Sequence, residues 1–251
     1  MENYKKNLEL LTKNHVYSEE MEHDACGVGL IASTEGKKSR AVVEYGIEAL
    51  KAVWHRGAVD ADGKTGDGAG IHVEIPKDFF IEKIQVTGHD YDNSEICVGM
   101  IFLPRNDYSA QENCKTIVES ELTKNNFSIY GWRQVPVNPK VLGEKALQTM
   151  PEIIQVLFKS NNQNLLDKNL ERKIYETRKR IENKAFEASL NNFYICSISS
   201  KSIIYKGLYL AEALSDFYLD LKDSRFISRY VIFHQRFSTN TAPSWSLAQP
   251  F

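Results

Sequence analysis

The sequence predicts an α+β fold in which β-sheets stack on one another and helices cover them. Three observations support this prediction. Several apolar runs look buried on both faces, helical patterns lie before, between and after these runs, and no repeat or low-complexity tract interrupts them. These features favour stacked sheets over a single doubly wound sheet. At 251 residues, the chain is long enough to bury a sizeable core.

The expected strands are short apolar or alternating runs bounded by proline, glycine or polar turns. They comprise a strand that opens at Cys26 and residues 71–75, 96–103, 127–137, 153–158, 193–199, 202–209 and 230–236. The polar turn Ser200-Lys201 separates two of these strands, 193–199 and 202–209. A tight polar turn between two apolar runs predicts a β-hairpin.

Helices are expected where apolar residues recur at helical spacing, at 40–54, 110–122, 165–188 and 212–221. The first should end before His55-Arg56-Gly57, because glycine commonly stops a helix. In the third, lysine and arginine are interleaved with glutamate. This mixture indicates a solvated helix face, and we expect no nucleic-acid binding there.

The composition is that of an ordinary soluble globular protein, with 42% hydrophobic residues and a net charge of −2. This charge gives no electrostatic reason to expect nucleic acid as a partner. No apolar run approaches the roughly 18 residues of a membrane span, and the N-terminus lacks the apolar core of a secretory signal. We therefore expect a cytoplasmic protein, or a plastid protein if the source is a photosynthetic eukaryote.

The cysteines and histidines are scattered along the chain. The four cysteines include no Cys-x-x-Cys pair, and the six histidines show no metal-ligand spacing. Neither a zinc site nor a disulfide framework is expected, and we predict no metal.

Cys26 is the first candidate for chemistry. Gly-Val-Gly and an apolar run follow it, so it should open a buried strand with room beside the sulfur. The polar residues 1–25 lack an apolar period and are expected to be a removable leader. Cleavage of the Ala25–Cys26 bond would give Cys26 an α-amine with a pKa of about 7.7–8.0, a base beside its own thiol. The alternative is a small buried hydrophobe, the commoner fate of a free cysteine.

Two arginines are further candidates. Arg236 closes a strand and precedes a run of hydroxyl and amide side chains, an arrangement suited to bidentate binding of a carboxylate. The alternative is a surface arginine before a polar turn. Arg56, at the end of the first helix, could equally be a helix-terminal charge. Between them, the loop 60–70 lacks the spacing of a P-loop or an EF-hand and is expected to bring backbone close to the active centre.

Five short sequence blocks follow one another along the chain. They are Cys26-Gly-Val-Gly, Ala-Val-Trp-His-Arg-Gly-Ala around Arg56, Thr65-Gly-Asp-Gly-Ala-Gly, His234-Gln-Arg-Phe-Ser-Thr-Asn-Thr and Ser244-Trp-Ser-Leu-Ala-Gln-Pro-Phe. From Cys26 to the last residue, the sequence closely resembles the class II glutamine amidotransferase domain at the N-terminus of glutamate synthase large chains.

The resemblance implies the four-layer αββα sandwich of N-terminal nucleophile hydrolases. It divides the chain into a leader, 1–25, and an amidotransferase domain, 26–251. In this family the leader is removed autocatalytically, and the exposed cysteine attacks the side-chain amide of L-glutamine. Ammonia leaves, and water hydrolyses the γ-glutamyl thioester. Cys26 matches that cysteine.

The resemblance also assigns binding roles by position. Arg236 matches the arginine that holds the α-carboxylate of glutamine, and Thr239 beside it contributes a hydroxyl. Arg56 matches the arginine that borders the substrate pocket. His234 and Asn240 are expected to order this corner of the site.

One departure from the family concerns the oxyanion hole. The family supplies it from an Asn-Gly pair beyond the last block, and the sequence contains no Asn-Gly dipeptide. We therefore expect a partial domain, with the sandwich incomplete at its C-terminal end. The alternatives are an inactive truncated fragment with a structural or assembly role, and an N-terminal nucleophile amidohydrolase acting on another amide.

The resemblance places other components outside this segment, in which no cofactor is expected. In glutamate synthases the ammonia reaches later domains that carry FMN and an iron–sulfur cluster and convert 2-oxoglutarate to glutamate. Electrons come from an NADPH-oxidising small subunit or from ferredoxin.

Overall fold

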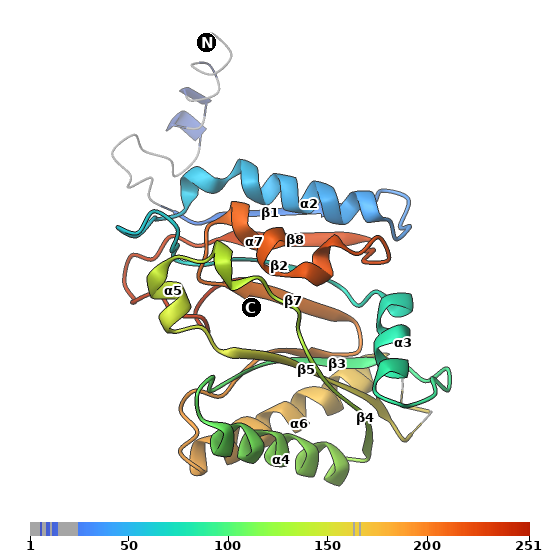
Figure 1. Ribbon diagram of the computed structural model, residues 1–251. Helices are drawn as coiled ribbons and strands as arrows, with labels where there is room; N and C mark the ends of the chain where they lie inside the picture. Colours follow the sequence, from blue (N-terminus) through green and yellow to red (C-terminus); the bar gives the residue numbers. More distant parts are fainter. Residues whose placement is uncertain (1–5, 7–8, 11, 15–24, 163, 166) are drawn as a thin grey trace.

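The computed structural model describes residues 6, 9–10, 12–14, 25–162, 164–165 and 167–251. The predicted leader, 1–25, lies largely outside the described residues. Within them, strands and helices form an α+β fold with two four-stranded antiparallel sheets. In Figure 1 the layers run from helix α2 at the top, through one sheet and then the other, to helices α4 and α6 at the bottom.

The first sheet, which we call the Cys26 sheet, has the spatial order β1 (Gly27–Ala32), β8 (Tyr230–Gln235), β2 (Ala69–Glu74) and β7 (Ser202–Gly207). The predicted strands after Cys26, at 71–75 and at 230–236 are confirmed here. The expectation that the first of them is buried is wrong. Strand β1 lies at the sheet edge, so Val28 and Leu30 remain 59% and 60% exposed.

The second sheet has the order β4 (Phe127–Gln134), β5 (Glu152–Ser160), β3 (Cys97–Leu103) and β6 (Tyr194–Ser199). Every residue of β3 is buried, as its continuous apolar run predicts. One face of this sheet packs on the core that it shares with the Cys26 sheet. The other face forms a separate core with α4 and α6.

The predicted hairpin between residues 193–199 and 202–209 is wrong, because β6 and β7 belong to different sheets. A side chain from a distant helix holds the turn between them. The carboxylate of Glu171 accepts hydrogen bonds from the Ser200 backbone N–H at 2.7 Å and from the Ser199 hydroxyl at 2.8 Å. The chain therefore crosses from one sheet to the other at this turn.

Helix α2 (Arg40–Ala52) begins at the N-cap Ser39, whose hydroxyl accepts a hydrogen bond from Val42 N–H. Its buried stripe packs on β1 and β8. The short helix η1 (Trp54–Arg56) follows at the predicted helix end. The expected helix at 212–221 is broken into three short turns, η3 (Ala211–Ala213), α7 (Leu214–Phe217) and η4 (Leu219–Lys222).

The remaining helices complete the layers. On the second sheet lie α4 (Tyr108–Lys124) and α6 (Asp167–Glu187), both predicted. Three short elements were not predicted: α3 (Lys77–Val86), η2 (Pro139–Val141) and α5 (Glu144–Gln148). Among the helices that the structure describes, none has the length and apolar character needed to cross a bilayer.

A buried ion pair ties the two halves of the sandwich together. Arg133 on β4 donates from both terminal nitrogens to Asp220 in η4, at 2.8 and 2.9 Å. The Tyr205 hydroxyl on β7 donates to the same carboxylate at 2.9 Å. The two charged side chains are only 13% and 3% exposed.

We expect Asp220→Ala to lower the free energy of unfolding by about 3–5 kcal/mol, because it leaves the buried Arg133 charge without its partner. Urea unfolding measures this loss. Asp216→Ala is the matched control, because the Asp216 carboxylate pairs with Lys222 while 58% exposed, and it should cost less than about 1 kcal/mol. Equal losses in the two variants would contradict the prediction.

Candidate active site

Cys26 lies immediately before β1, at the end of the Cys26 sheet where β8 ends. Because Gly27 pairs with Gln235, the residue before β1 meets the residues after β8. The half-buried Cys26 sulfur accepts a hydrogen bond from the Phe237 backbone N–H at 3.4 Å and donates to the Phe237 carbonyl at 3.7 Å. The thiol is therefore held against the backbone that follows Arg236.

The other three cysteines, all in the described part of the chain, are buried. Burial raises the pKa of Cys97 well above its usual value and raises the pKa of Cys114 and of Cys196 to about 11. A buried thiol of this kind is a poor nucleophile. Cys26 is thus the thiol of this chain that a substrate can reach.

Arg236 is buried, with 6% of its surface exposed, so it is not the surface arginine that we considered as an alternative. Its backbone N–H donates to the Gly68 carbonyl at 2.8 Å. Its guanidinium donates to the Thr241 hydroxyl at 2.5 Å and to the Asp67 carbonyl at 3.5 Å. Both acceptors are neutral, so neither offsets the guanidinium charge, which can attract an anion.

The glycine-rich loop before β2 contacts this arginine through its backbone carbonyls. This loop was expected from the sequence to bring backbone close to the site. Besides its carbonyl contact with Arg236, Asp67 accepts a hydrogen bond from the Ser238 backbone N–H on its carboxylate, at 2.5 Å. Gly68 has a φ of +125°, and a Cβ there would lie 2.7 Å from the Cβ of Ala248. Both the backbone conformation and the close approach therefore require glycine.

Arg56 lies close to Gly27, the residue that follows Cys26. It is exposed and ends η1, and its Cβ lies 3.1 Å from the position that a Cβ on Gly27 would occupy. The fold therefore brings three predicted residues, Cys26, Arg56 and Arg236, to one end of the Cys26 sheet.

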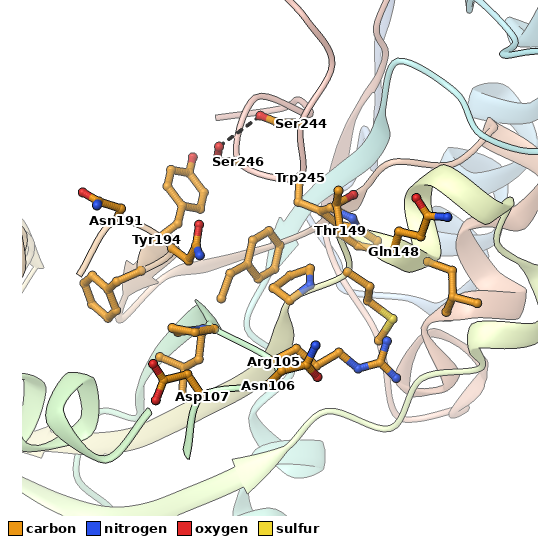
Figure 2. Close-up of a pocket in the computed structure, with 18 of the residues that line it drawn as sticks. Arg105, Asn106, Asp107, Gln148, Thr149, Asn191, Tyr194, Ser244, Trp245 and Ser246 are labelled. Carbon is orange, nitrogen blue, oxygen red and sulfur yellow. Dashed lines mark hydrogen bonds between the residues drawn. The ribbon is translucent and has the colours of Figure 1, made fainter. Parts of the chain in front are cut away.

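A cavity of about 930 Å³ lies elsewhere, and none of the predicted site residues lines it. It opens between the second sheet and the chain around Trp245, with Arg105, Thr149 and Tyr194 among its lining residues (Figure 2). The described residues also contain no group of three or more His, Cys, Asp or Glu side chains that could hold a metal ion.

Comparisons with known proteins identify the family of the chain. A family model for class II glutamine amidotransferases matches residues 26–251. The chain belongs to this family. The large chain of the NADPH glutamate synthase of Azospirillum brasilense is 55% identical over 248 residues, which is 99% of this chain and 16% of that relative.

The names of two further relatives describe ferredoxin-dependent enzymes. The ferredoxin-dependent glutamate synthase 1 of Arabidopsis thaliana, chloroplastic/mitochondrial, is 42% identical over 231 residues, or 91% of this chain and 14% of that relative. The ferredoxin-dependent glutamate synthase 2 of Synechocystis is 40% identical over 230 residues, again 91% and 14%. The chain thus spans 14–16% of the length of these curated relatives.

Two residues of this candidate site, Asp67 and Thr241, were not singled out by the sequence analysis. The Thr241 hydroxyl accepts the hydrogen bond from the Arg236 guanidinium. Thr239 and Asn240 lie exposed in the turn that Ser238 closes through a hydrogen bond to the Thr241 carbonyl. The position of Asp67 in the glycine-rich block was a signal that could have identified it.

His234 lies on β8 opposite Val28 and is half-buried. Its Nε2 is buried and makes no hydrogen bond within the part of the chain that the structure describes. Burial, with a smaller effect of the Arg236 charge, lowers the pKa of His234. The fold therefore favours the neutral imidazole beside the arginine.

The stability of the domain should consequently fall as the pH drops below about 6.5, because the unfolded chain then takes up a proton that the folded state resists. We expect His234→Asn to reduce this fall, measured as Tm between about pH 7.5 and 5. The control is His55→Asn at an exposed position, which should leave the pH dependence unchanged. An unaltered pH profile in His234→Asn would refute the assignment.

Proposed function

We propose that this domain hydrolyses the side-chain amide of L-glutamine through a γ-glutamyl thioester on Cys26, as the glutaminase part of a glutamate synthase. One observation carries the proposal. In a chain of the class II amidotransferase family, a reachable thiol and a buried guanidinium with neutral acceptors meet at one sheet end. The first suits nucleophilic attack, and the second suits the carboxylate of an amino-acid substrate.

The proposed reaction begins with removal of residues 1–25. The match to the family model starts at Cys26, and Ala25 is exposed, which supports cleavage between them. The freed α-amine takes the thiol proton, and the sulfur attacks the amide carbon of glutamine. The C–N bond then breaks, ammonia leaves with the proton, and water hydrolyses the thioester to glutamate and the free thiol.

The proposed binding roles rest on the resemblance to the family, and the positions of the side chains support them. Arg236 pairs with the α-carboxylate of glutamine and exchanges its contact with Thr241 for this stronger, charge-assisted one. Thr239 adds a hydroxyl from the same turn, and Arg56, which lies near Gly27, borders the substrate pocket. His234 and Asn240 order this corner.

The layer order, helix on sheet on sheet on helix, supports assignment to the αββα sandwich of N-terminal nucleophile hydrolases (Figure 1). In the whole protein, we infer that the ammonia serves to convert 2-oxoglutarate to glutamate. That step belongs to domains outside this chain, with FMN, an iron–sulfur cluster and electrons from an NADPH-oxidising subunit or ferredoxin.

Cys26→Ala should abolish release of ammonia from glutamine, because the nucleophile is gone. Intact-mass measurement should show wild-type protein that starts at Cys26 and, when quenched during turnover, carries one added glutamyl group. Cys196→Ala, at a buried thiol, is the control and should keep the activity. Undiminished turnover in Cys26→Ala would sink the proposal. A wild-type protein that keeps Met1 and releases no ammonia would instead favour an inactive fragment with a structural role.

Arg236→Met should raise the KM for glutamine by about 10- to 100-fold, since a charge-assisted carboxylate contact contributes roughly 1.5–3 kcal/mol. Initial rates over a range of glutamine concentrations measure this change. Arg105→Met, at an exposed arginine of the distant cavity, should have no effect. Activity that does not respond to Arg236→Met would favour an amidohydrolase acting on another amide.

A further inference from the structure

Residues 236–248 form a loop, and both ends of this loop contact Gly68, the residue immediately before β2. At one end, the Arg236 N–H donates to the Gly68 carbonyl at 2.8 Å. At the other end, a Cβ placed on Gly68 would lie 2.7 Å from the Cβ of Ala248. Loops with adjoining ends pack largely through their own side chains. We call residues 237–241 the first limb and residues 244–248 the second limb of this 236–248 loop.

The first limb contacts Cys26 and Asp67, whereas the second limb is anchored in the core. Trp245 is 5% exposed and donates from its indole nitrogen to the Ala146 carbonyl at 3.1 Å. Its ring packs against Phe102, Tyr209 and Phe217. The second limb is thus fixed partly by an apolar anchor.

The second anchor of this limb is polar and comes from Lys206 on β7. The Lys206 amine donates to the Ser246 carbonyl at 3.0 Å and to the Tyr194 hydroxyl at 3.0 Å. Tyr194 and Ser246 lie side by side in Figure 2. The amine also lies over the Phe251 ring, 4.3 Å from its centre. Across the strand, Gly70 opposite Lys206 leaves room for the carbonyl of Gln249.

The burial of Lys206 is complete, with 0% of the residue exposed. A lysine normally keeps its amine in water, so full burial is costly and needs compensating partners. Here the partners are a carbonyl, a hydroxyl and aromatic rings. Burial lowers the pKa of Lys206 to about 8, and the charges of Arg178 and Arg236 act in the same direction, whereas Cys196 opposes them. The fold thus retains the Lys206 amine although burial disfavours its charged form. This amine contacts the second limb at Ser246.

We propose that Lys206 is a positioning residue for the Arg236 end of the site: its buried amine fixes the second limb, and the closed loop in turn holds Arg236 in place beside Gly68. The chain connects these parts directly, because both limbs close on Gly68. Loss of the Ser246 contact lets the second limb shift and loosens the first. For its effect on glutamine, this inference rests on the proposed function.

The first test measures the loop itself and needs no activity. In the full chain, Lys206→Met keeps the length of the side chain and removes the donor. Hydrogen exchange of the Leu247 and Ala248 amides, both bonded to the Ser244 carbonyl, should become at least about tenfold faster. Val118→Ala is the control, because Val118 lies in the separate core between α4 and the second sheet, and it should leave these amides unchanged. Equal exchange in wild type and Lys206→Met overturns the inference.

The second test asks whether Lys206 acts through Arg236. Lys206→Met should raise the KM for glutamine about tenfold with kcat nearly kept, and it should add nothing in an Arg236→Met background. Full additivity of the two substitutions overturns the positioning role. If wild-type protein releases no ammonia from glutamine, the proposed function fails, while the exchange measurement still decides whether Lys206 holds the loop.

Discussion

The candidate site depends on the pairing of β8 with both of its neighbours in the Cys26 sheet. Gln235 on β8 lies opposite Gly27 on β1 and opposite Ala69 on β2, so one rung of the ladder joins three distant parts of the chain. The residues next to this rung are Cys26, Arg236 and Gly68. Side chains on a strand alternate between faces, so a slip of one residue would turn the buried face of β8 outward. The apolar pairing that fixes the register therefore also fixes the distance between the thiol and the guanidinium.

Gln235 itself stabilises this rung. It is fully buried, its side-chain oxygen accepts from the Ala211 N–H at 3.0 Å, and its amide nitrogen donates to the Gly68 carbonyl at 3.4 Å. Gly57, just after Arg56, leaves the space that this side chain fills. A buried amide with its hydrogen bonds made is stable, whereas an unpaired one would be costly. The two turns around Arg56 and Gly68 are thus packed on the same polar side chain, which the sequence analysis did not single out.

The sequence predicted the fold well where a single element decides its own structure. The apolar run of β3 and the amphipathic pattern of α2 are local properties, and both predictions are confirmed. Helix α3 was missed because its apolar residues do not form one stripe; Phe79 is buried, but Val86 is 78% exposed. The hairpin at Ser200-Lys201 failed for a different reason. The turn has ordinary hairpin chemistry, and a carboxylate from α6, some thirty residues away in sequence, redirects it.

In the candidate site, too, the sequence predicted some residues and missed others. The motif blocks predicted Cys26, Arg56 and Arg236, which the fold brings together. Asp67 could not be found by periodicity, because its contact with Ser238 depends on the register of strands far apart in the chain. The contact of Thr241 with Arg236 spans only five residues, but it is made within a loop, which has no periodic pattern. Short-range patterns report which residues are available, and the ladder between β8 and β2 decides which of them touch.

The contacts of the Cys26 sulfur bear on how it could become a nucleophile. Its two hydrogen-bonding partners are the N–H and the carbonyl of Phe237. An amide N–H can stabilise a thiolate, but neither backbone group is basic enough to remove the thiol proton. While Ala25 is attached, the nitrogen of Cys26 is also an amide and has no basic lone pair. In the proposed mechanism, cleavage before Cys26 therefore does more than uncover the thiol. It converts the adjacent nitrogen into an amine that titrates near neutral pH, and so supplies the base that the surrounding backbone lacks.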